Sequence, residues 1–242
     1  MKVIKHAFFF MVLIAFLLFS SCSARISGQI NQSGAADFSV NLGLKPRISG
    51  LIRSIQAFSG EVNANILDGE AIAASMSGIP SLGSVNFKNI SPQSIDGNIK
   101  ITKIGDFLAV GKTLLDTDSF LLFETDAAGK GGHCIININN KTCPQMLALL
   151  SPDISDYLEA LMAPIVTGEV LTKNEYLDAV KSIYGSGISD EIAQSQIQVS
   201  IGFPGTVKSV KNGKSNGTKA EFDINLLDLL VLEKPLIYEV IW

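Results

Sequence analysis

The first 22 residues constrain this chain more than any other segment. Lys2 and Lys5 supply positive charge, and an uninterrupted apolar run of 13 residues follows at 7–19. That run is shorter than the roughly 20 apolar residues that an ordinary membrane-spanning helix needs. The order of charge, apolar run and small residues is typical of a secretory signal. We therefore expect residues 1–21 to be removed as a signal peptide, so the fold has to be built by the chain that follows.

Cys22 comes directly after Ser20 and Ser21, at the end of the apolar run. This arrangement resembles the lipobox of bacterial lipoproteins. The resemblance implies cleavage before Cys22, a diacylglycerol on its sulfur and a further acyl chain, such as palmitate, on its amine. Several acyl chains would anchor the protein stably, whereas one chain gives only marginal binding. The alternative is ordinary cleavage after Ala24, which would leave a freely soluble protein.

Composition narrows the class of partner. Removal of residues 1–21 leaves 221 residues and moves the net charge from −4 to −6, because Lys2 and Lys5 are lost. A mildly acidic chain without a basic block has no electrostatic footprint for nucleic acid. We expect a membrane-anchored envelope protein. Ser23 stands where many bacteria read aspartate as a retention signal, which favours the outer membrane.

Periodicity indicates an α+β fold. Alternating apolar and polar residues predict strands in these segments: 25–42 as a hairpin, 85–90, 97–108, 120–124, 133–138 and several between 197 and 242. Helical spacing predicts helices in another four: 44–58, 69–76, 154–165 and 172–184. Thr172 and Glu175 have the spacing of a capping box. We expect an antiparallel β-sheet packed against amphipathic helices, with residues 22–30 as a lipidated tether and 31–242 as a single globular domain.

The two remaining cysteines, Cys134 and Cys143, lie nine positions apart. An exported chain enters a compartment that permits disulfides. We expect these cysteines to pair, closing a short loop worth up to about 3 kcal/mol in the chain-entropy model. The alternative is a metal or catalytic site, but a four-ligand zinc site needs more cysteine and histidine than this region contains.

The sequence offers little support for catalysis. His133 is the one histidine after the signal peptide, and its neighbour Cys134 would point to the opposite face of a strand. The stretch 105–113 resembles a phosphate-binding loop, but five residues separate its glycines where the motif needs four. The acidic residues at 116–126 lack the spacing of a calcium loop. We expect no catalytic residue, no metal and no cofactor.

The C-terminal part carries a family resemblance. Phe203-Pro204-Gly205, the Asn212-Gly213 turn and the segment 217–222 resemble the module of LppM-type bacterial lipoproteins. That family combines a lipobox with an α+β domain and has been linked to envelope lipids or lipid-linked glycans. The helical section at 151–184 is also reminiscent of spirochaete-type lipoproteins of similar length. Neither resemblance supplies a catalytic residue.

The sequence is consistent with two functions. The first is a non-catalytic binder of lipid or another apolar envelope ligand, held between helix and sheet. Periodicity suggests these pocket-lining residues for it: Leu51, Ile55, Leu158, Leu161 and Met162. The second is a structural or protein-interaction lipoprotein without a small-molecule ligand. A pocket of several hundred cubic ångströms between helix and sheet would favour the first, and a flat apolar surface patch the second.

Overall fold

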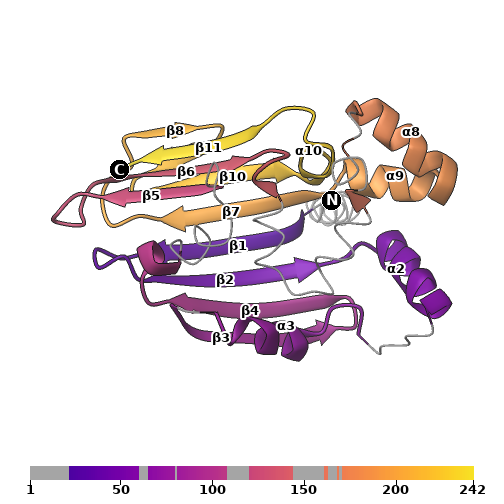
Figure 1. The fold of residues 1–242 in the computed structure, drawn as a ribbon, viewed down its shortest axis with the longest axis horizontal. Coiled ribbons are helices and arrows are strands. Elements are labelled where there is room, and N and C mark those ends of the chain that lie inside the picture. Colours follow the sequence, from indigo (N-terminus) through magenta and orange to yellow (C-terminus); the bar gives the residue numbers. More distant parts are fainter. Residues whose placement is uncertain are drawn as a thin grey trace, which may run out of the picture.

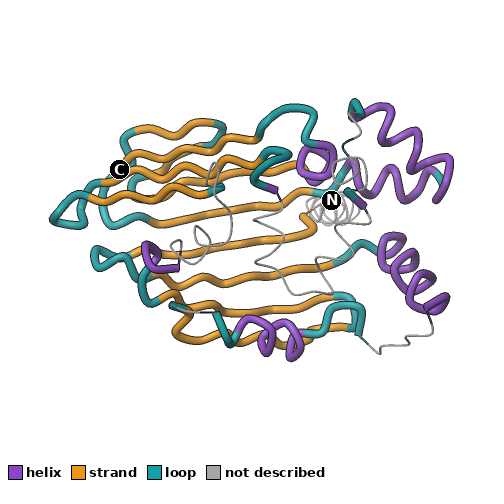
Figure 2. Tube along the Cα trace, in the orientation of Figure 1, coloured by secondary structure: helices purple, strands orange, loops and turns teal. Residues whose placement is uncertain are grey.

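The computed structural model describes residues 22–59, 65–79, 81–107, 120–143, 161–162, 168 and 171–242. Over these residues the chain has the expected α+β organisation, with two largely antiparallel sheets and several helices (Figures 1 and 2). No helix in the described part is long and apolar enough to cross a membrane. Of the predicted helix at 154–165, all but residues 161–162 lies outside the described residues.

The larger sheet, sheet A, has seven strands in the order β3-β4-β2-β1-β7-β10-β9. Their bounds are β1 (Cys22–Ile30), β2 (Ala36–Gly43), β3 (Leu82–Ser91), β4 (Ser94–Ile101), β7 (Gln196–Gly202), β9 (Lys214–Asn216) and β10 (Lys219–Asn225). The middle strand, β1, pairs antiparallel with β2 on one side and parallel with β7 on the other. The predicted hairpin over 25–42 is thus confirmed. Residues 22–30 are a paired central strand, so the expected tether is wrong for this segment.

The smaller sheet, sheet B, has four strands in the order β5-β6-β11-β8. Their bounds are β5 (Leu121–Thr125), β6 (Gly132–Ile138), β8 (Ser209–Lys211) and β11 (Leu236–Ile241). The predicted pair at 120–124 and 133–138 corresponds to β5 and β6, which are antiparallel. In Figure 1, sheet B lies in front of the β7–β10 half of sheet A. A buried cluster that includes Phe203, Phe222 and Trp242 fills the space between the two sheets.

The helices extend the core beyond the sheets. Their bounds are α2 (Pro46–Ser59), α3 (Gly69–Met76), α8 (Lys173–Tyr184), α9 (Ser186–Ala193) and α10 (Leu226–Val231). α3 covers β3 and β4, where Ile72 meets Phe87 and Ile95. The other four contribute to a second cluster at one end of the sheets, which includes Ile48, Val180, Ile192 and Leu230. The helices predicted at 44–58, 69–76 and 172–184 are therefore confirmed as α2, α3 and α8.

Local capping explains two helix starts. The backbone N–H of Glu175 donates to Thr172 Oγ1 at 3.3 Å, and the N–H of Thr172 donates to Glu175 Oε2 at 2.8 Å, which is the predicted capping box. The Thr172 N–H and the Thr172 hydroxyl, which donates to Glu175 Oε2 at 2.8 Å, lower the pKa of Glu175. The first turn of α2 has no acidic residue of its own. Instead the N–H groups of Arg47 and Ile48 donate to the Glu191 carboxylate of α9, at 3.0 Å each to Oε2.

Two phenylalanines lie across glycines of the neighbouring strand in sheet A. Phe38 stands opposite Gly28, and Phe87 stands opposite Gly97. A Cβ at Gly28 would collide with the Phe38 ring, and one at Gly97 with the Phe87 ring. The two glycines are therefore required for close approach of an aromatic ring to the strand backbone.

We expect Gly97→Ala to lower the free energy of unfolding by about 1–3 kcal/mol, because the added methyl overpacks a buried site. Gly50→Ala is the matched control, since Gly50 lies on α2 and a Cβ there meets nothing within 4 Å. It should raise stability by about 0.5–1 kcal/mol through helix propensity. Urea denaturation of the detergent-solubilised protein measures both. A Gly97→Ala midpoint equal to that of the wild type would contradict this account of the packing.

Candidate functional site

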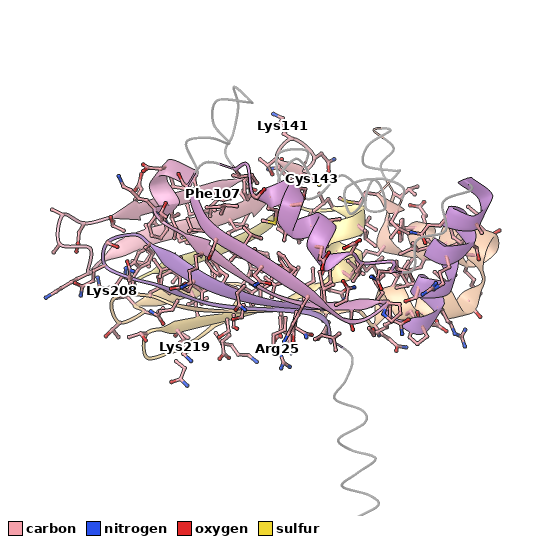
Figure 3. All side chains as sticks on the ribbon, turned by 90° about the horizontal axis from the view of Figure 1, so that it is seen from below. Arg25, Phe107, Lys141, Cys143, Lys208 and Lys219 are labelled. Atoms are coloured by element: carbon pink, nitrogen blue, oxygen red, sulfur yellow. The ribbon has the colours of Figure 1, made fainter. Side chains whose placement is uncertain are left out.

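The face of sheet A that points away from sheet B is polar. Strand alternation places Ala24, Ile26 and Ile30 of β1 on the inner face, whereas Arg25, Ser27 and Gln29 point outward and are exposed. Figure 3 shows the two sides, with Arg25 and Lys219 on one side of the molecule and Cys143 on the other. The same alternation holds for β2, β4, β7 and β10, so this face, which we call the open face, displays polar side chains from five neighbouring strands.

Strand register aligns these side chains in rows. One row runs across the strands as Asn86, Asn98, Ser39, Ser27, Ser200 and Glu221. The next runs as Lys88, Asp96, Asn41, Arg25, Gln198 and Asp223. The first row has a single charged side chain, Glu221, and the second combines four charged side chains with two amides.

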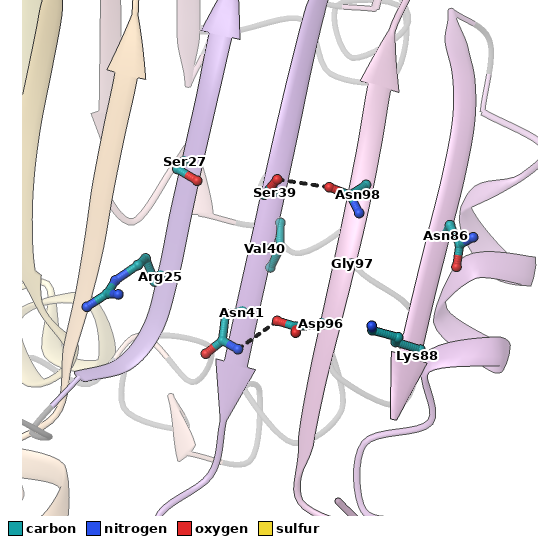
Figure 4. A pocket seen from close by; sticks show the side chains of 10 residues that line it. All are labelled: Arg25, Ser27, Ser39, Val40, Asn41, Asn86, Lys88, Asp96, Gly97 and Asn98. Carbon is teal, nitrogen blue, oxygen red and sulfur yellow. Dashed lines mark hydrogen bonds between the residues drawn. The ribbon is translucent and has the colours of Figure 1, made fainter. Parts of the chain in front are cut away.

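A concavity of about 400 Å³ lies over the β1–β3 half of the open face (Figure 4). Four strands line it, with these residues: Arg25, Ser27, Ser39, Val40, Asn41, Asn86, Lys88, Asp96, Gly97 and Asn98. Its volume is within the range of small-molecule sites. Its lining is nevertheless mostly polar, which suits a ligand rich in charge and hydroxyl groups.

Hydrogen bonds fix part of the lining. Ser39 Oγ donates to Asn98 Oδ1 at 2.8 Å, and Asn41 Nδ2 donates to Asp96 Oδ1 at 2.7 Å (Figure 4). Arg25 Nη2 donates to Gln198 Oε1 at 3.2 Å. Among the described residues, the Lys88 ammonium has no hydrogen-bond or ion-pair partner. The concavity therefore combines prealigned groups with a cation that is available to a ligand.

The residues predicted to line an apolar pocket lie elsewhere. Met162 is fully buried in the helical cluster, Leu161 packs against the same cluster, and Leu51 is half-buried on α2. Tyr176 reaches into this region, where its hydroxyl donates to the carbonyl of Leu161 at 2.9 Å. Burial raises the pKa of that hydroxyl. Leu158 and the side chain of Ile55 lie outside the described residues.

The open-face residues were missed as a site by sequence reasoning. Alternation placed Arg25, Ser27 and Ser39 on strands, but small polar residues on the solvent side of a strand are ordinary. The available signal was that each of several strands carries Ser, Asn or Gln rather than Lys or Glu outward. Only the register shows that these residues form continuous rows.

The predicted disulfide is not formed. Cys134 and Cys143 are both free thiols. Cys134 packs into the cluster between the sheets, whereas Cys143 is buried in the helical cluster. The four residue-to-residue steps from Cys134 to Ile138 of β6 span about 13 Å in an extended strand. Because the turn at 139–142 places Cys143 beyond that strand end, the pair exceeds the roughly 7 Å Cα separation that a bridge allows.

Sheet B carries a second surface on its outer side. Phe123, Cys134 and Val240 point into the core, so the alternate residues of the same strands point outward. Half-buried or exposed aliphatic residues gather there: Leu122, Ile135, Ile237 and Ile241. Beside them, His133 Nε2 and Glu239 Oε1 are 2.7 Å apart. We call these four aliphatic residues the sheet B patch. None of them belongs to the core clusters of the described chain.

Comparison with known proteins adds one weak similarity. No protein-family model and no curated protein matches the chain. The folded domain of Mycobacterium tuberculosis LppM, solved by NMR, aligns with 90% of this chain and 86% of that chain. The TM-score is 0.40 and the identity is 9%. LppM is the type that residues 203–222 resemble, but at this TM-score we draw no conclusion about family or function from the alignment.

We expect both thiols to react slowly in the folded protein at pH 8. Burial raises the pKa of Cys134 to about 12 and that of Cys143 to about 11, so little of the reactive thiolate is present, and reaction should quicken as the pH rises towards 11. A chromogenic thiol assay on the Cys22→Ser chain should detect two thiols after urea unfolding without reductant, and one in the Cys22→Ser/Cys134→Ser chain. Thiols that appear only after reduction would restore the disulfide.

Proposed function

We propose that this protein is a non-catalytic lipoprotein of the bacterial envelope, anchored through acylated Cys22 and binding an envelope lipid. The main support for this proposal is the position of Cys22 at the start of β1. Cleavage after Ala24 would remove the first residues of the central strand of sheet A. Ala24 is only 8% exposed and pairs with Leu42 of β2 and with Ile197 of β7. Cleavage before Cys22 leaves the strand intact, which supports the lipoprotein interpretation over the soluble alternative.

The chemistry of the described residues supports a binding role rather than a catalytic one. His133 contacts Glu239 and stands on the opposite face of β6 from Cys134. Both thiols are buried with raised pKa values, unlike a nucleophilic cysteine. Among the described residues, no group of three His, Cys, Asp or Glu side chains is placed to hold a metal.

The geometry favours the polar part of a lipid as the bound group. The apolar site predicted around Leu161 and Met162 is occupied by packed core at both residues. The concavity on the open face is instead lined by charged, amide and hydroxyl groups. A lipid ligand would therefore be recognised through its headgroup. Outer-membrane location remains part of the proposal and rests on Ser23.

A second candidate function is protein interaction through the sheet B patch. The patch presents Ile241 at 37% exposure, with three half-buried aliphatic residues beside it. Clustered aliphatic side chains at a surface are a feature of protein-interaction sites. In this alternative, the acylated Cys22 would hold the domain at the membrane while the patch contacts a protein partner.

The anchor predicts a simple labelling pattern. In cells that make the full chain, an alkyne analogue of palmitate should label the wild type and Cys134→Ser but not Cys22→Ser, because only Cys22 follows the signal peptide directly. In-gel fluorescence after coupling a dye measures the label. Unlabelled wild type with Arg25 as its first residue would establish the soluble alternative instead.

The protein-interaction alternative is tested by site-specific photocrosslinking in the same cells. A benzoylphenylalanine at Ile237, on the sheet B patch, should give a discrete protein adduct if the patch binds a partner. The matched control places the same side chain at Ser39 on the open face, where the alternative predicts none. Absence of an adduct at Ile237, or equal adducts at both positions, would reject the patch as a specific interface.

A further inference from the structure

We propose that the open face of sheet A lies against the membrane and that its concavity binds a phosphate-bearing, hydroxylated lipid headgroup. The inference deepens the proposed function, since it rests on acylation of Cys22. It names the surface, the ligand class and the residues that would recognise the ligand.

The proposed anchor, Cys22, and the concavity lie close together in sheet A. Arg25 lies three residues after Cys22 on the same strand, so its Cα is about 10 Å from that of Cys22 at most. Asn41 stands on the adjacent strand directly opposite Arg25. Lys88 lies three strands from β1, about 14 Å away at ordinary strand spacing. The concavity therefore begins within one headgroup layer of the lipid attachment point.

β1 cannot lengthen this reach by peeling away. It pairs with β7 from Cys22 onward and with β2 from Ala24 onward, and Ala24 and Ile30 are buried on the inner face. Freeing the strand as far as Ala24 would break pairs of both ladders and expose apolar surface. The acyl chains thus hold the domain at a short, fixed distance from the bilayer. Binding of a membrane lipid at the concavity is then effectively intramolecular, at high local concentration.

The concavity contains side chains of both charges, with an excess of positive charge. Arg25 and Lys88 bring two positive charges, and Asp96 brings one negative charge. Arg25 uses Nη2 for Gln198, which leaves its other guanidinium N–H groups for a phosphate. Lys88 is without a partner among the described side chains. The two cations stand in the same cross-strand row, with Asn41 and Asp96 between them.

The lining of the concavity fits a headgroup that combines a phosphate with hydroxyl groups. A phosphodiester satisfies the cations, while hydroxyl groups match Asp96 and the neighbouring amides. Asp96 accepts from Asn41 through Oδ1, so Oδ2 is left to accept from a ligand hydroxyl. Phosphatidylglycerol carries both features, whereas phosphatidylcholine carries the phosphate without hydroxyls and with a bulky cation. We therefore expect preference for the former.

The test uses the full, acylated chain in nanodiscs that contain equal amounts of phosphatidylglycerol and phosphatidylcholine. Native mass spectrometry of the released protein counts the lipids that stay bound. We expect one phosphatidylglycerol on the wild type, and about a tenfold or greater loss of this preference in Arg25→Gln/Lys88→Gln, since charge-assisted hydrogen bonds are lost. Lys211→Gln/Lys234→Gln is the matched control, because it removes the same charge from exposed positions outside the concavity and should retain the lipid.

Three outcomes of the lipid counts overturn the proposal. They are no preference in the wild type, preference kept in Arg25→Gln/Lys88→Gln, and loss in the control double variant. Displacement of the lipid by an equal concentration of free glycerol phosphate would also overturn it, because the soluble ester rather than the membrane lipid would be the ligand. The same spectra report the acyl mass on Cys22, so failure of the anchor is seen separately from failure of the headgroup site.

Discussion

The pairing of β1 on both of its edges is the constraint on which the rest of the structure depends. β1 joins the β3-β4-β2 group to the β7-β10-β9 group, and its parallel ladder with β7 connects residues near both ends of the sequence. Without β1, sheet A would divide into two three-stranded pieces with two new unpaired edges. Because this strand begins at Cys22, the proposed lipid anchor is attached to the middle of the sheet and not to a flexible arm.

The two faces of sheet A follow from the same strands. On β2, Phe38 and Leu42 face the core, while Ser39 and Asn41 face outward. A register shift of one residue would exchange these faces and expose the apolar side chains. Burial of the apolar face therefore also determines which side chains point outward. The inner face is covered by sheet B and α3, and the open face is left to polar rows. The proposed anchor at the start of β1 would bring those rows to the level of lipid headgroups.

Sequence patterns predicted the local elements well, because their signals are local. The hairpin over 25–42, the capping box of Thr172 and Glu175, and the helices α2, α3 and α8 follow from periodicity and caps within a few residues. The pairing of Cys134 with Cys143 failed, because spacing in sequence does not show that a strand separates the two side chains. The apolar pocket suggested around Leu161 and Met162 stays a prediction: both residues pack in the helical cluster, and apolar periodicity describes a core and a ligand site equally.

The sequence by itself determined the expectation of an export signal, the candidate lipidation site at Cys22, the α+β class and the positions of most strands and helices. These properties depend on neighbouring residues, on the period of apolar side chains and on the length of an apolar run. Only the tertiary structure decided that residues 22–30 are a central strand, that Arg25 shares a row with Lys88, and that the two cysteines lie in different clusters. Each of these depends on which distant strands pair and in what register, which is set by burial across the whole sheet.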